Sequence, residues 1–498
     1  MHRRSKEPSI MAAHVAPALF SLFVLCVATS GGPALADSTP IHPSLRDKCS
    51  TIVIGKEVTA DGATMLAHNE DLGNYSAHRY IYVPHKRHTP GEEVVTYFGA
   101  RVPQVHETYA YTGTSLFDIA YSPGDVTSGI NEHLVAVVNN ASYTREAPDP
   151  LPTEGRIIWT EFTKFALERA RTAREAVAVI GGLASAHQLG GDSGTMFGVI
   201  DPNEGWWIEI TYDGQWVAQR MPADGATARA NIFRIGKVDF KDPENFRYSD
   251  DLVSYAEARS WYQSGDFDFA AVYAEPTLIG SAYNLRRTQR IADLLAPAVT
   301  TGLVTPQLVM TVLRDHYEGT EYDLTNGHRQ GSPHQTDERT LCRLDTEVST
   351  VIQARTKIGR WAVPPEIGGI AWRAMGTPCT SVYSPWYLGS RDIPREYQAG
   401  DSQYTEGSAY WTARNLSRLV DMRYKSQVLQ PIWGVRDAFE QGVFAMQPKI
   451  EATALQLYRW NPELARRYLS EYSSSLARQA QEKLKGMIRT AQSPHQGR

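Results

Sequence analysis

The chain has 498 residues and a formal net charge of −5 at pH 7, with 50 basic against 55 acidic side chains. This slight acidic excess argues against a nucleic-acid-binding or anionic-membrane-binding protein, because both need clusters of positive charge. Hydrophobic residues make up 42% of the sequence, which is enough for a large buried core. The length by itself predicts two or three domains.

The N-terminus has the pattern of an export signal. A basic start at residues 3–6 is followed by an apolar run at 16–29 and a small-x-small cleavage site at 34–36. The apolar run is shorter than the roughly 20 residues that a membrane span needs. We therefore predict a signal peptide at 1–36, a linker or pro-segment at 37–48, and a secreted or periplasmic protein that leaves the membrane.

From Cys49 onward the pattern changes to short apolar runs typical of strands. We expect strands at residues 51–55, 64–68, 80–83, 93–98 and 134–139. The dipeptide Asp61-Gly62 predicts a hairpin turn between the first two strands.

Helical periodicity follows at 157–171, and the capping box from Thr172 to Glu175 opens a second helix that Gly181-Gly182 should end. An antiparallel meander then follows. Its strands are expected at 195–200, 206–212, 215–221 and 227–235.

The C-terminal half alternates helices with irregular segments. Helices are expected at 250–263, 285–296 and 306–318, and again from residue 409 to the end of the chain. A Trp- and Pro-rich stretch at 360–402 is expected to be irregular. The class is α+β. We predict a core at 49–350 and a segment at 351–498 that completes the same catalytic unit.

Three cysteines remain after the signal is removed: Cys49, Cys342 and Cys379. Export implies an oxidising compartment, and an odd count there leaves one thiol free. Cys342 and Cys379 lie in the same half of the chain and could form a disulfide, which would leave Cys49 as the free thiol.

Cys49 has three interpretations from the residues alone. It could be half of a disulfide, an inert buried thiol, or a nucleophile exposed when the Lys48–Cys49 bond is cleaved. The third has a chemical rationale, because a nucleophilic thiol needs a base within hydrogen-bond reach. A new N-terminal amine has a pKa of about 7.7–8.0 and lies on the same residue. The predicted hairpin also returns residues 68–71 towards Cys49, so that a carboxylate there could orient the amine or the thiol.

Several segments together resemble one family. The opening segment 49–71 has the sequence CSTIVIGKEVTADGATMLAHNED. It resembles the start of the dipeptidase A/secernin group of cysteine N-terminal-nucleophile (Ntn) hydrolases, which are related to penicillin V acylase and bile salt hydrolase. The resemblance continues at 129–132 and 216–235. Segments 367–387 and 407–416 are similar to the dipeptidase branch and not to the bile salt hydrolases.

The resemblance implies a role for five residues. Cys49 would be the nucleophile and, through its amine, the general base. Asp71 would position the nucleophile. Asn231 and Asn140 would bind the oxyanion, for which each donor typically contributes about 100–1000-fold in rate. Arg287 would match an arginine found late in the superfamily's sequences.

Three positions leave alternatives open. Asn139 competes with Asn140, because a shift of one residue moves a side chain to the other face of a strand. Arg286 competes with Arg287. His68 stands where the acylases have Arg, so it is either a substitute donor or a plain strand residue, and the charge balance around the thiolate is in question.

The resemblance implies a four-layer αββα Ntn-hydrolase sandwich with antiparallel sheets and an appended helical C-terminal region. It also implies a dipeptidase freed by autoprocessing at Lys48–Cys49 and acting on small peptides. The alternatives are an N-acyl amide hydrolase or acyltransferase of the same superfamily, or a non-catalytic exported scaffold protein.

The 14 histidines show no familiar ligand spacing, so we expect no metal and no cofactor. The sequence leaves the oligomeric state open.

Overall fold

Two antiparallel sheets lie face to face in the computed structural model, which describes residues 49–72, 77–117, 125–323, 332–334, 339–422 and 429–493. These residues all belong to one compact unit, Ser44–Arg498. The predicted signal peptide and linker lie outside the described residues. None of the helices in the described ranges combines the length and apolarity needed to cross a membrane.

The first sheet has six strands and starts at the predicted nucleophile. In spatial order its strands are β14 (Ala226–Arg229), β1 (Ser50–Ile54), β2 (Thr64–Asp71), β16 (Thr346–Ala354), β19 (Gly369–Met375) and β20 (Ser384–Tyr387). Every residue of β1 and β2 is buried, because these central strands are covered on both faces. Segments from both halves of the chain therefore share one sheet.

The second sheet has eight strands. In spatial order they are β15 (Phe246–Tyr248), β13 (Trp216–Arg220), β12 (Gly205–Thr211), β11 (Gly194–Ile200), β10 (Ala136–Ser142), β9 (Ser128–Asn131), β8 (Tyr111–Leu116) and β3 (His78–Val83). Three two-stranded ribbons accompany it. They are β4 (Lys86–Arg87) with β7 (Glu107–Thr108), β5 (Glu93–Val95) with β6 (Arg101–Pro103), and β17 (Lys357–Ile358) with β18 (Trp361–Ala362).

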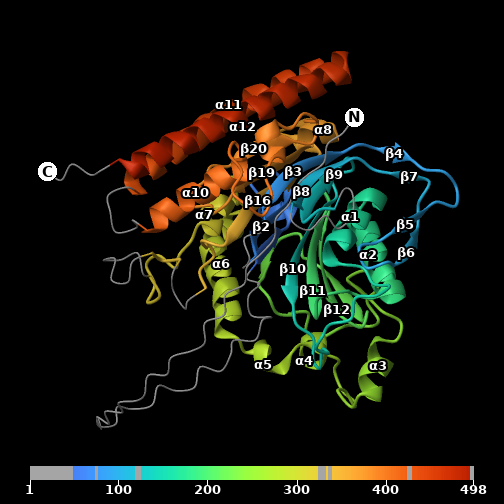
Figure 1. Cartoon of the computed structure of the whole chain (residues 1–498). Helices are drawn as coiled ribbons and strands as arrows, with labels where there is room; N and C mark the ends of the chain where they lie inside the picture. Colours follow the sequence, from blue (N-terminus) through green and yellow to red (C-terminus); the bar gives the residue numbers. More distant parts are fainter. Residues whose placement is uncertain are drawn as a thin grey trace, which may run out of the picture. The chain divides into compact units, whose positions relative to one another are not determined.

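Helices α1 (Trp159–Arg169) and α2 (Ala173–His187) cover the outer face of the second sheet (Figure 1). Phe162 and Phe165 of α1 pack in one apolar cluster with Val137 of β10. Amphipathic helices bury one stripe in this way.

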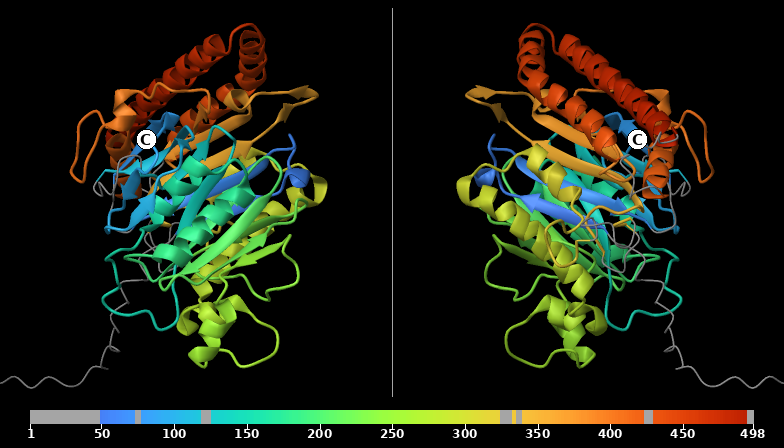
Figure 2. Two further views of the ribbon diagram at one scale, coloured as in Figure 1. Left: turned by 90° about the vertical axis from the view of Figure 1, so that its right-hand side faces the viewer. Right: turned by 90° about the vertical axis from the view of Figure 1, so that its left-hand side faces the viewer.

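Other helices lie against the first sheet. Helix α7 (Pro306–Leu313) contacts β2 and β16, and the C-terminal helices contact β19 and β20. Figure 2 shows the long C-terminal helices, in red, beside the orange strands. The remaining elements of this half are α6 (Ala282–Thr301), α8 (Pro365–Gly368), α9 (Arg395–Gln398), α10 (Ala409–Met422), α11 (Leu429–Trp460) and α12 (Pro462–Gln492). The expected αββα order with a helical C-terminal region is therefore confirmed.

Shorter helices complete the described part of the chain. They are η2 (Lys56–Val58), α3 (Leu252–Ala258), α4 (Phe269–Tyr273) and α5 (Pro276–Ile279).

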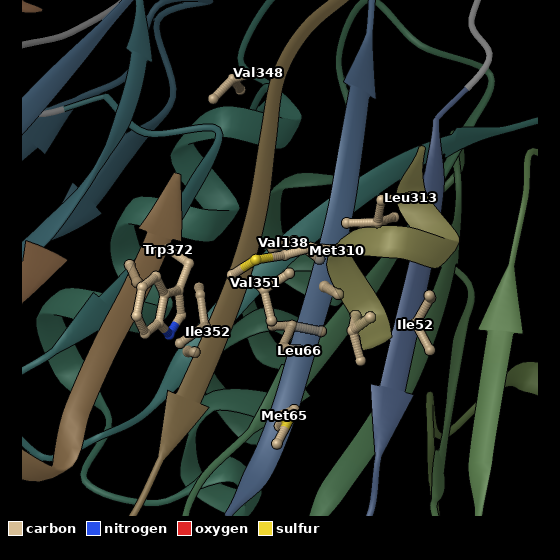
Figure 3. Packing of buried hydrophobic residues seen from close by; sticks show 14 of the residues in the cluster. Ile52, Met65, Leu66, Val138, Met310, Leu313, Val348, Val351, Ile352 and Trp372 are labelled. Carbon is tan, nitrogen blue, oxygen red and sulfur yellow. The ribbon is translucent and has the colours of Figure 1, made fainter. Parts of the chain in front are cut away.

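The apolar core runs through the first sheet on both of its faces. Figure 3 shows Leu66 of β2 near Val138 of β10, and Met310 and Leu313 of α7 beside β2. Leu66 approaches Gly198 of β11, where an added Cβ would lie 2.9 Å from its Cδ1 atom. Close approach of the two sheets thus depends on a residue without a side chain.

Some predicted boundaries are wrong. The segment predicted as the fourth meander strand does not continue the second sheet, because β14 crosses to pair with β1 and β15 takes the edge. The stretch expected to be irregular contains β19 and β20. Helix α7 ends at Leu313, which frees the residues that follow for side-chain contacts.

Helix α2 also continues past the glycine pair that was expected to end it. The helix runs to His187, and Gly181 lies against the ring of Trp216. An added Cβ at Gly181 would meet the Cζ2 atom of that ring at 2.4 Å, whereas nothing lies within 4 Å of one at Gly182. Gly181 is therefore present for packing and not as a helix stop.

We expect Gly181→Ala to lower the free energy of unfolding by about 1–3 kcal/mol, because overpacking against Trp216 outweighs the better helix propensity of Ala. The matched control Gly182→Ala should gain up to about 1 kcal/mol. Urea denaturation of both variants measures the difference. Equal stability of the two would contradict this packing role.

Candidate active site

The pairing of β1 with β2 determines what faces Cys49. Ser50 pairs with Asn69 and Thr51 with His68, so the register places Glu70 opposite Cys49. Because side chains alternate along a strand, Asp71 points to the other face of β2.

Cys49 and Glu70 lie on the face of the first sheet that meets the second sheet. The methyl group of Thr51 would lie 3.3 Å from a Cβ at Gly198 of β11. Cys49, His68 and Glu70 follow the same alternation as Thr51 and are directed between the two sheets.

The Cys49 side chain is only 2% exposed, and its sulfur contacts the end of β2. The thiol donates to Oε1 of Glu70 at 3.6 Å, and the backbone N–H of Asp71 donates to the sulfur at 3.4 Å. Sequence analysis predicts that the Asp71 carboxylate positions the nucleophile. In the structure, the groups that contact the sulfur are the Asp71 backbone and the Glu70 carboxylate.

A hydrogen-bonded chain leads away from Glu70. Its Oε2 atom lies 3.1 Å from Nε2 of His68, and Nδ1 of His68 lies 2.6 Å from the Thr51 hydroxyl. That hydroxyl donates to Oδ1 of Asn140. His68 is therefore not a plain strand residue, because it links the carboxylate beside Cys49 to Asn140.

The Asn140 amide has one orientation that satisfies its neighbours. Its Nδ2 group donates to the carbonyl oxygens of Ala230 at 3.0 Å, Arg229 at 3.2 Å and Cys49 at 3.4 Å. Because all three are acceptors only, Oδ1 must face the Thr51 hydroxyl.

This orientation determines the protons on His68. The Thr51 hydroxyl has one hydrogen and gives it to Asn140, so Nδ1 of His68 must donate to Thr51. Nε2 then meets Glu70 either as an imidazolium facing a carboxylate or as a neutral ring facing a carboxylic acid. The His68–Glu70 pair is electrically neutral in both cases.

The structure distinguishes Asn139 from Asn140. Asn139 shares a face of β10 with Val137, which packs against the α1 side, and its Nδ2 donates to Thr195 at 3.4 Å. Asn140 faces the first sheet and reaches Cys49. Only Asn140 is therefore placed at the candidate site.

Arg287, on α6, is fully buried and holds Cys49 from the other side. Its Nη1 donates to the carbonyl oxygen of Cys49 at 2.9 Å, and its Nη2 donates to Oδ1 of Asn231 at 3.0 Å and of Asn284 at 2.6 Å. Burial lowers the pKa of Arg287 to about 10, although the nearby Asp71 carboxyl opposes this shift. The guanidinium thus remains charged at neutral pH.

Arg286 lies elsewhere. Its guanidinium stacks over the ring of Tyr322, 3.7 Å from the ring centre. Successive helix residues point about 100° apart, so only one of this arginine pair can face Cys49. That one is Arg287.

Asn231 has a defined orientation for the same reason as Asn140. Its Oδ1 accepts from Arg287, so Nδ2 is directed to the carbonyl oxygen of Ala141 at 3.1 Å. The structure therefore brings Asn140 and Arg287 to the Cys49 carbonyl oxygen and Asn231 to Arg287, while their catalytic roles stay predictions.

The Asp71 carboxylate lies in a buried pocket on the opposite face of β2. Oδ1 accepts from the Thr346 hydroxyl at 2.6 Å, and Oδ2 has no hydrogen-bond partner among the described residues. Burial, together with the nearby charge of Asp345, raises the pKa of Asp71 to about 8. Asp71 therefore holds a proton over much of the neutral range.

Two groups of described side chains have the geometry to hold a metal ion. One is Cys49 with His68 and Glu70, and the other combines His316, His334, Cys342 and Cys379. The prediction of a disulfide between Cys342 and Cys379 is wrong for this structure, because neither sulfur is bonded to another sulfur.

A family model for peptidase family C69 matches residues 48–431. The chain belongs to this family. It is therefore a hydrolase of peptide bonds, and the family expected from the sequence is confirmed. The match begins one residue before Cys49.

Bacterial relatives match over most of their length. Proteins named "Probable dipeptidase" from Latilactobacillus sakei and Salmonella dublin are each 28% identical. The first match covers 76% of this chain and 81% of the relative, and the second 72% and 84%. "Dipeptidase A" of Lactobacillus helveticus is 24% identical, with 81% of this chain and 87% of the relative covered.

Among solved structures, penicillin V acylase from Agrobacterium tumefaciens is 13% identical and covers 68% of this chain and 86% of its own, with a TM-score of 0.36. A mutant of conjugated bile acid hydrolase from Clostridium perfringens is 12% identical and covers 72% of this chain and 97% of its own, with a TM-score of 0.32.

Sequence reasoning missed the contributions of Glu70 and Thr51. It included Glu70 only in the returning segment 68–71 and did not single it out. The Asp-Gly turn alone misplaces the pairing, because the 3-10 helix η2 lengthens the connection between β1 and β2. The signal that could have found Glu70 is its spacing of two from His68, which puts both on one face of a strand.

Replacing Asp71 should change how stability depends on pH. The unfolded carboxyl loses its proton near pH 4, whereas the folded one keeps it to about pH 8, so the free energy of unfolding falls across this window by at most about 1.4 kcal/mol per pH unit. Asp71→Asn should remove that part of the decline.

Urea denaturation at pH 5, 6.5 and 8 measures the slope. It is best done in a Cys49→Ala background, so that chain cleavage does not intervene. Parallel pH profiles with and without Asp71→Asn would show that Asp71 has an ordinary pKa.

Proposed function

We propose that this chain is an exported dipeptidase in which Cys49, freed by autoprocessing at Lys48–Cys49, is the nucleophile. The observation that carries the proposal is the convergence of Asn140, Asn231 and Arg287 on the start of β1, where Cys49 lies. The family match that begins at residue 48 supports the same boundary.

Cleavage would place the general base on the nucleophile itself. The amine of Cys49 would titrate near neutral pH and could take the thiol proton without a separate histidine. The thiolate would attack the scissile carbonyl, and the amine would return the proton to the leaving amine. Water would then hydrolyse the thioester.

The amides of Asn231 and Asn140 are the proposed oxyanion donors. Both Nδ2 groups donate to backbone carbonyl oxygens in this structure, so the oxyanion would have to take the place of one of these acceptors. Nδ2 of Asn231 is turned away from Arg287, and Nδ2 of Asn140 lies 3.4 Å from the Cys49 carbonyl oxygen. Donors whose orientation is already set need little reorganisation to stabilise developing charge. In this scheme Arg287 is a positioning residue, since it fixes both the Cys49 carbonyl and Asn231.

The His68–Glu70 pair would be a polar group without net charge beside the Cys49 thiol. A lone carboxylate 3.6 Å from the sulfur would oppose thiolate formation, because like charges repel. His68 offsets that charge at 3.1 Å. This arrangement would replace the arginine that the acylases carry at the position of His68.

Dipeptides are the proposed substrates because of the relatives' names. Relatives that match over 81–87% of their own length include proteins called "Probable dipeptidase" and "Dipeptidase A". Export is proposed from the signal-like N-terminus alone.

Intact mass and N-terminal sequencing of the secreted protein test the nucleophile. We expect a chain that begins at Cys49 and hydrolyses dipeptides. Cys49→Ala should keep the bond at Lys48 and lose activity by at least about 1000-fold. The control Gly182→Ala, an exposed position on α2 away from Cys49, should still be cleaved at the same bond. Dipeptide hydrolysis by Cys49→Ala would overturn the mechanism, and cleavage of acyl amides in place of dipeptides would overturn the substrate.

The charge balance beside the thiol predicts a pH effect. His68→Gln leaves Glu70 unpaired, which raises the pKa of the new amine and should move the acid limb of kcat/KM up by about one pH unit. The double variant His68→Gln/Glu70→Gln also removes the negative charge of Glu70, so the acid limb of kcat/KM should return to its position in the unmodified protein. Identical profiles for the single and double variants would contradict the pairing role.

A further inference from the structure

A second buried cluster lies away from Cys49. It consists of His316, His334, Cys342 and Cys379, all with 8% exposure or less, and the nitrogen and sulfur ligand atoms lie within 4.8 Å of one another. Four such side chains rarely meet in a protein core without a chemical reason, because each is polar or reactive.

The four residues come from separate parts of the chain. His316 follows α7, Cys342 precedes β16, and Cys379 follows β19. His334 lies in the described segment 332–334. The cluster therefore connects four segments where the structure has few other regular elements.

Three of the six distances among the four ligand atoms lie close to the edges of a tetrahedron, and the other three are below 4.8 Å. Nε2 of His334 lies 3.0 Å from Nε2 of His316, 3.7 Å from Sγ of Cys342 and 3.6 Å from Sγ of Cys379. Zinc bonds of about 2.05 Å to nitrogen and 2.3 Å to sulfur give edges of about 3.3 Å between nitrogens and about 3.6 Å from nitrogen to sulfur. A single ion at the centre would reach all four atoms with small adjustments.

Both imidazoles are held from behind by carboxylates. Nδ1 of His316 lies 2.8 Å from Oε1 of Glu318, and Nδ1 of His334 lies 3.1 Å from Oδ1 of Asp421. The Ser332 hydroxyl also donates to Asp421. A carboxylate on the far nitrogen is the usual support of a metal-binding histidine, because it fixes the ring and leaves Nε2 to face the ion.

We propose that His316, His334, Cys342 and Cys379 form a structural zinc site. Two thiolates and two neutral imidazoles bind Zn²⁺ as an electrically neutral unit, which suits a buried position. The two thiol protons are released when the ion binds. Softer thiolate and imidazole ligands in a tetrahedron favour zinc over magnesium or calcium.

The site has a route for the ion. A surface cavity of about 660 Å³ is lined in part by His316, Glu318 and Cys379. The cluster thus borders solvent on one side although its ligand side chains are buried.

The zinc would also stabilise the segments that pack against β2 next to the candidate active site. The Asn69 side chain of β2 donates to the carbonyl oxygens of Leu313 at 2.9 Å and Leu341 at 2.8 Å. These two carbonyls lie one to three residues from His316 and Cys342. An ion that fixes both segments would therefore also fix β2 next to Glu70.

The competing arrangement is a disulfide between Cys342 and Cys379. It would remove both thiolates and leave the Nε2 atoms of two buried imidazoles 3.0 Å apart. One of these two nitrogens would have to carry a proton, because two lone pairs at that distance repel each other. Zinc satisfies all four groups at once, and a disulfide satisfies two.

Metal analysis of the full chain, purified without chelator or metal-affinity resin, tests the proposal. We expect about one zinc ion per chain. Cys379→Ser and His334→Gln should each reduce the zinc content at least about tenfold. Cys49→Ser is the matched control. Cys49 belongs to the second possible metal group, with His68 and Glu70, and not to the proposed site, so this variant should keep the zinc ion.

Cobalt exchange of the unmodified chain avoids variants that fail to fold. Co²⁺ should give the thiolate charge-transfer band and the strong visible bands of a tetrahedral site. Three results would overturn the proposal: a chain without zinc, a Cys342–Cys379 bridge in non-reducing peptide maps, or loss of zinc in Cys49→Ser. Dipeptide hydrolysis is measured alongside: a chain that lacks zinc but hydrolyses dipeptides would overturn the zinc site and leave the proposed function standing.

Discussion

The register between β1 and β2 is the constraint on which the candidate site depends. It sets Glu70 opposite Cys49 and directs Thr51 and His68 to the same face. A shift by one residue would turn these side chains towards the helices and bring Asp71 and Asn69 between the sheets. The apolar core enforces the register, because Leu66 fits only where Gly198 leaves room.

Sequence reasoning located some of the residues that touch Cys49 but not Glu70, whose carboxylate accepts from the thiol. Cys49 starts a strand after a polar segment. Family resemblance supplied Arg287, which donates to the Cys49 carbonyl oxygen, and Asn231, which accepts from Arg287. The choice between Asn139 and Asn140 could not be made from sequence, because strand alternation fixes a face only once the pairing is known. The Asp71 role stays a prediction, since its backbone and not its carboxylate meets the sulfur.

Other features depended on partners far away in the chain. Gly181 resembles a helix stop until Trp216 is seen to occupy the space of its missing side chain. β14 looks like a meander strand, yet it pairs with β1. The four residues of the proposed zinc site span positions 316 to 379, so no local spacing could reveal them. Short ligand motifs, on which the expectation of a metal-free protein rests, do not include ligands that lie so far apart in the chain.

The contacts of Cys49 bear on how a latent precursor would be activated. Those described here are made by its sulfur and by its carbonyl oxygen, which accepts from Arg287 and Asn140. Both atoms lie on the side of the Lys48–Cys49 bond that cleavage leaves in place. Cleavage at Lys48–Cys49 would leave these four contacts in place, so this part of the site would be the same before and after maturation.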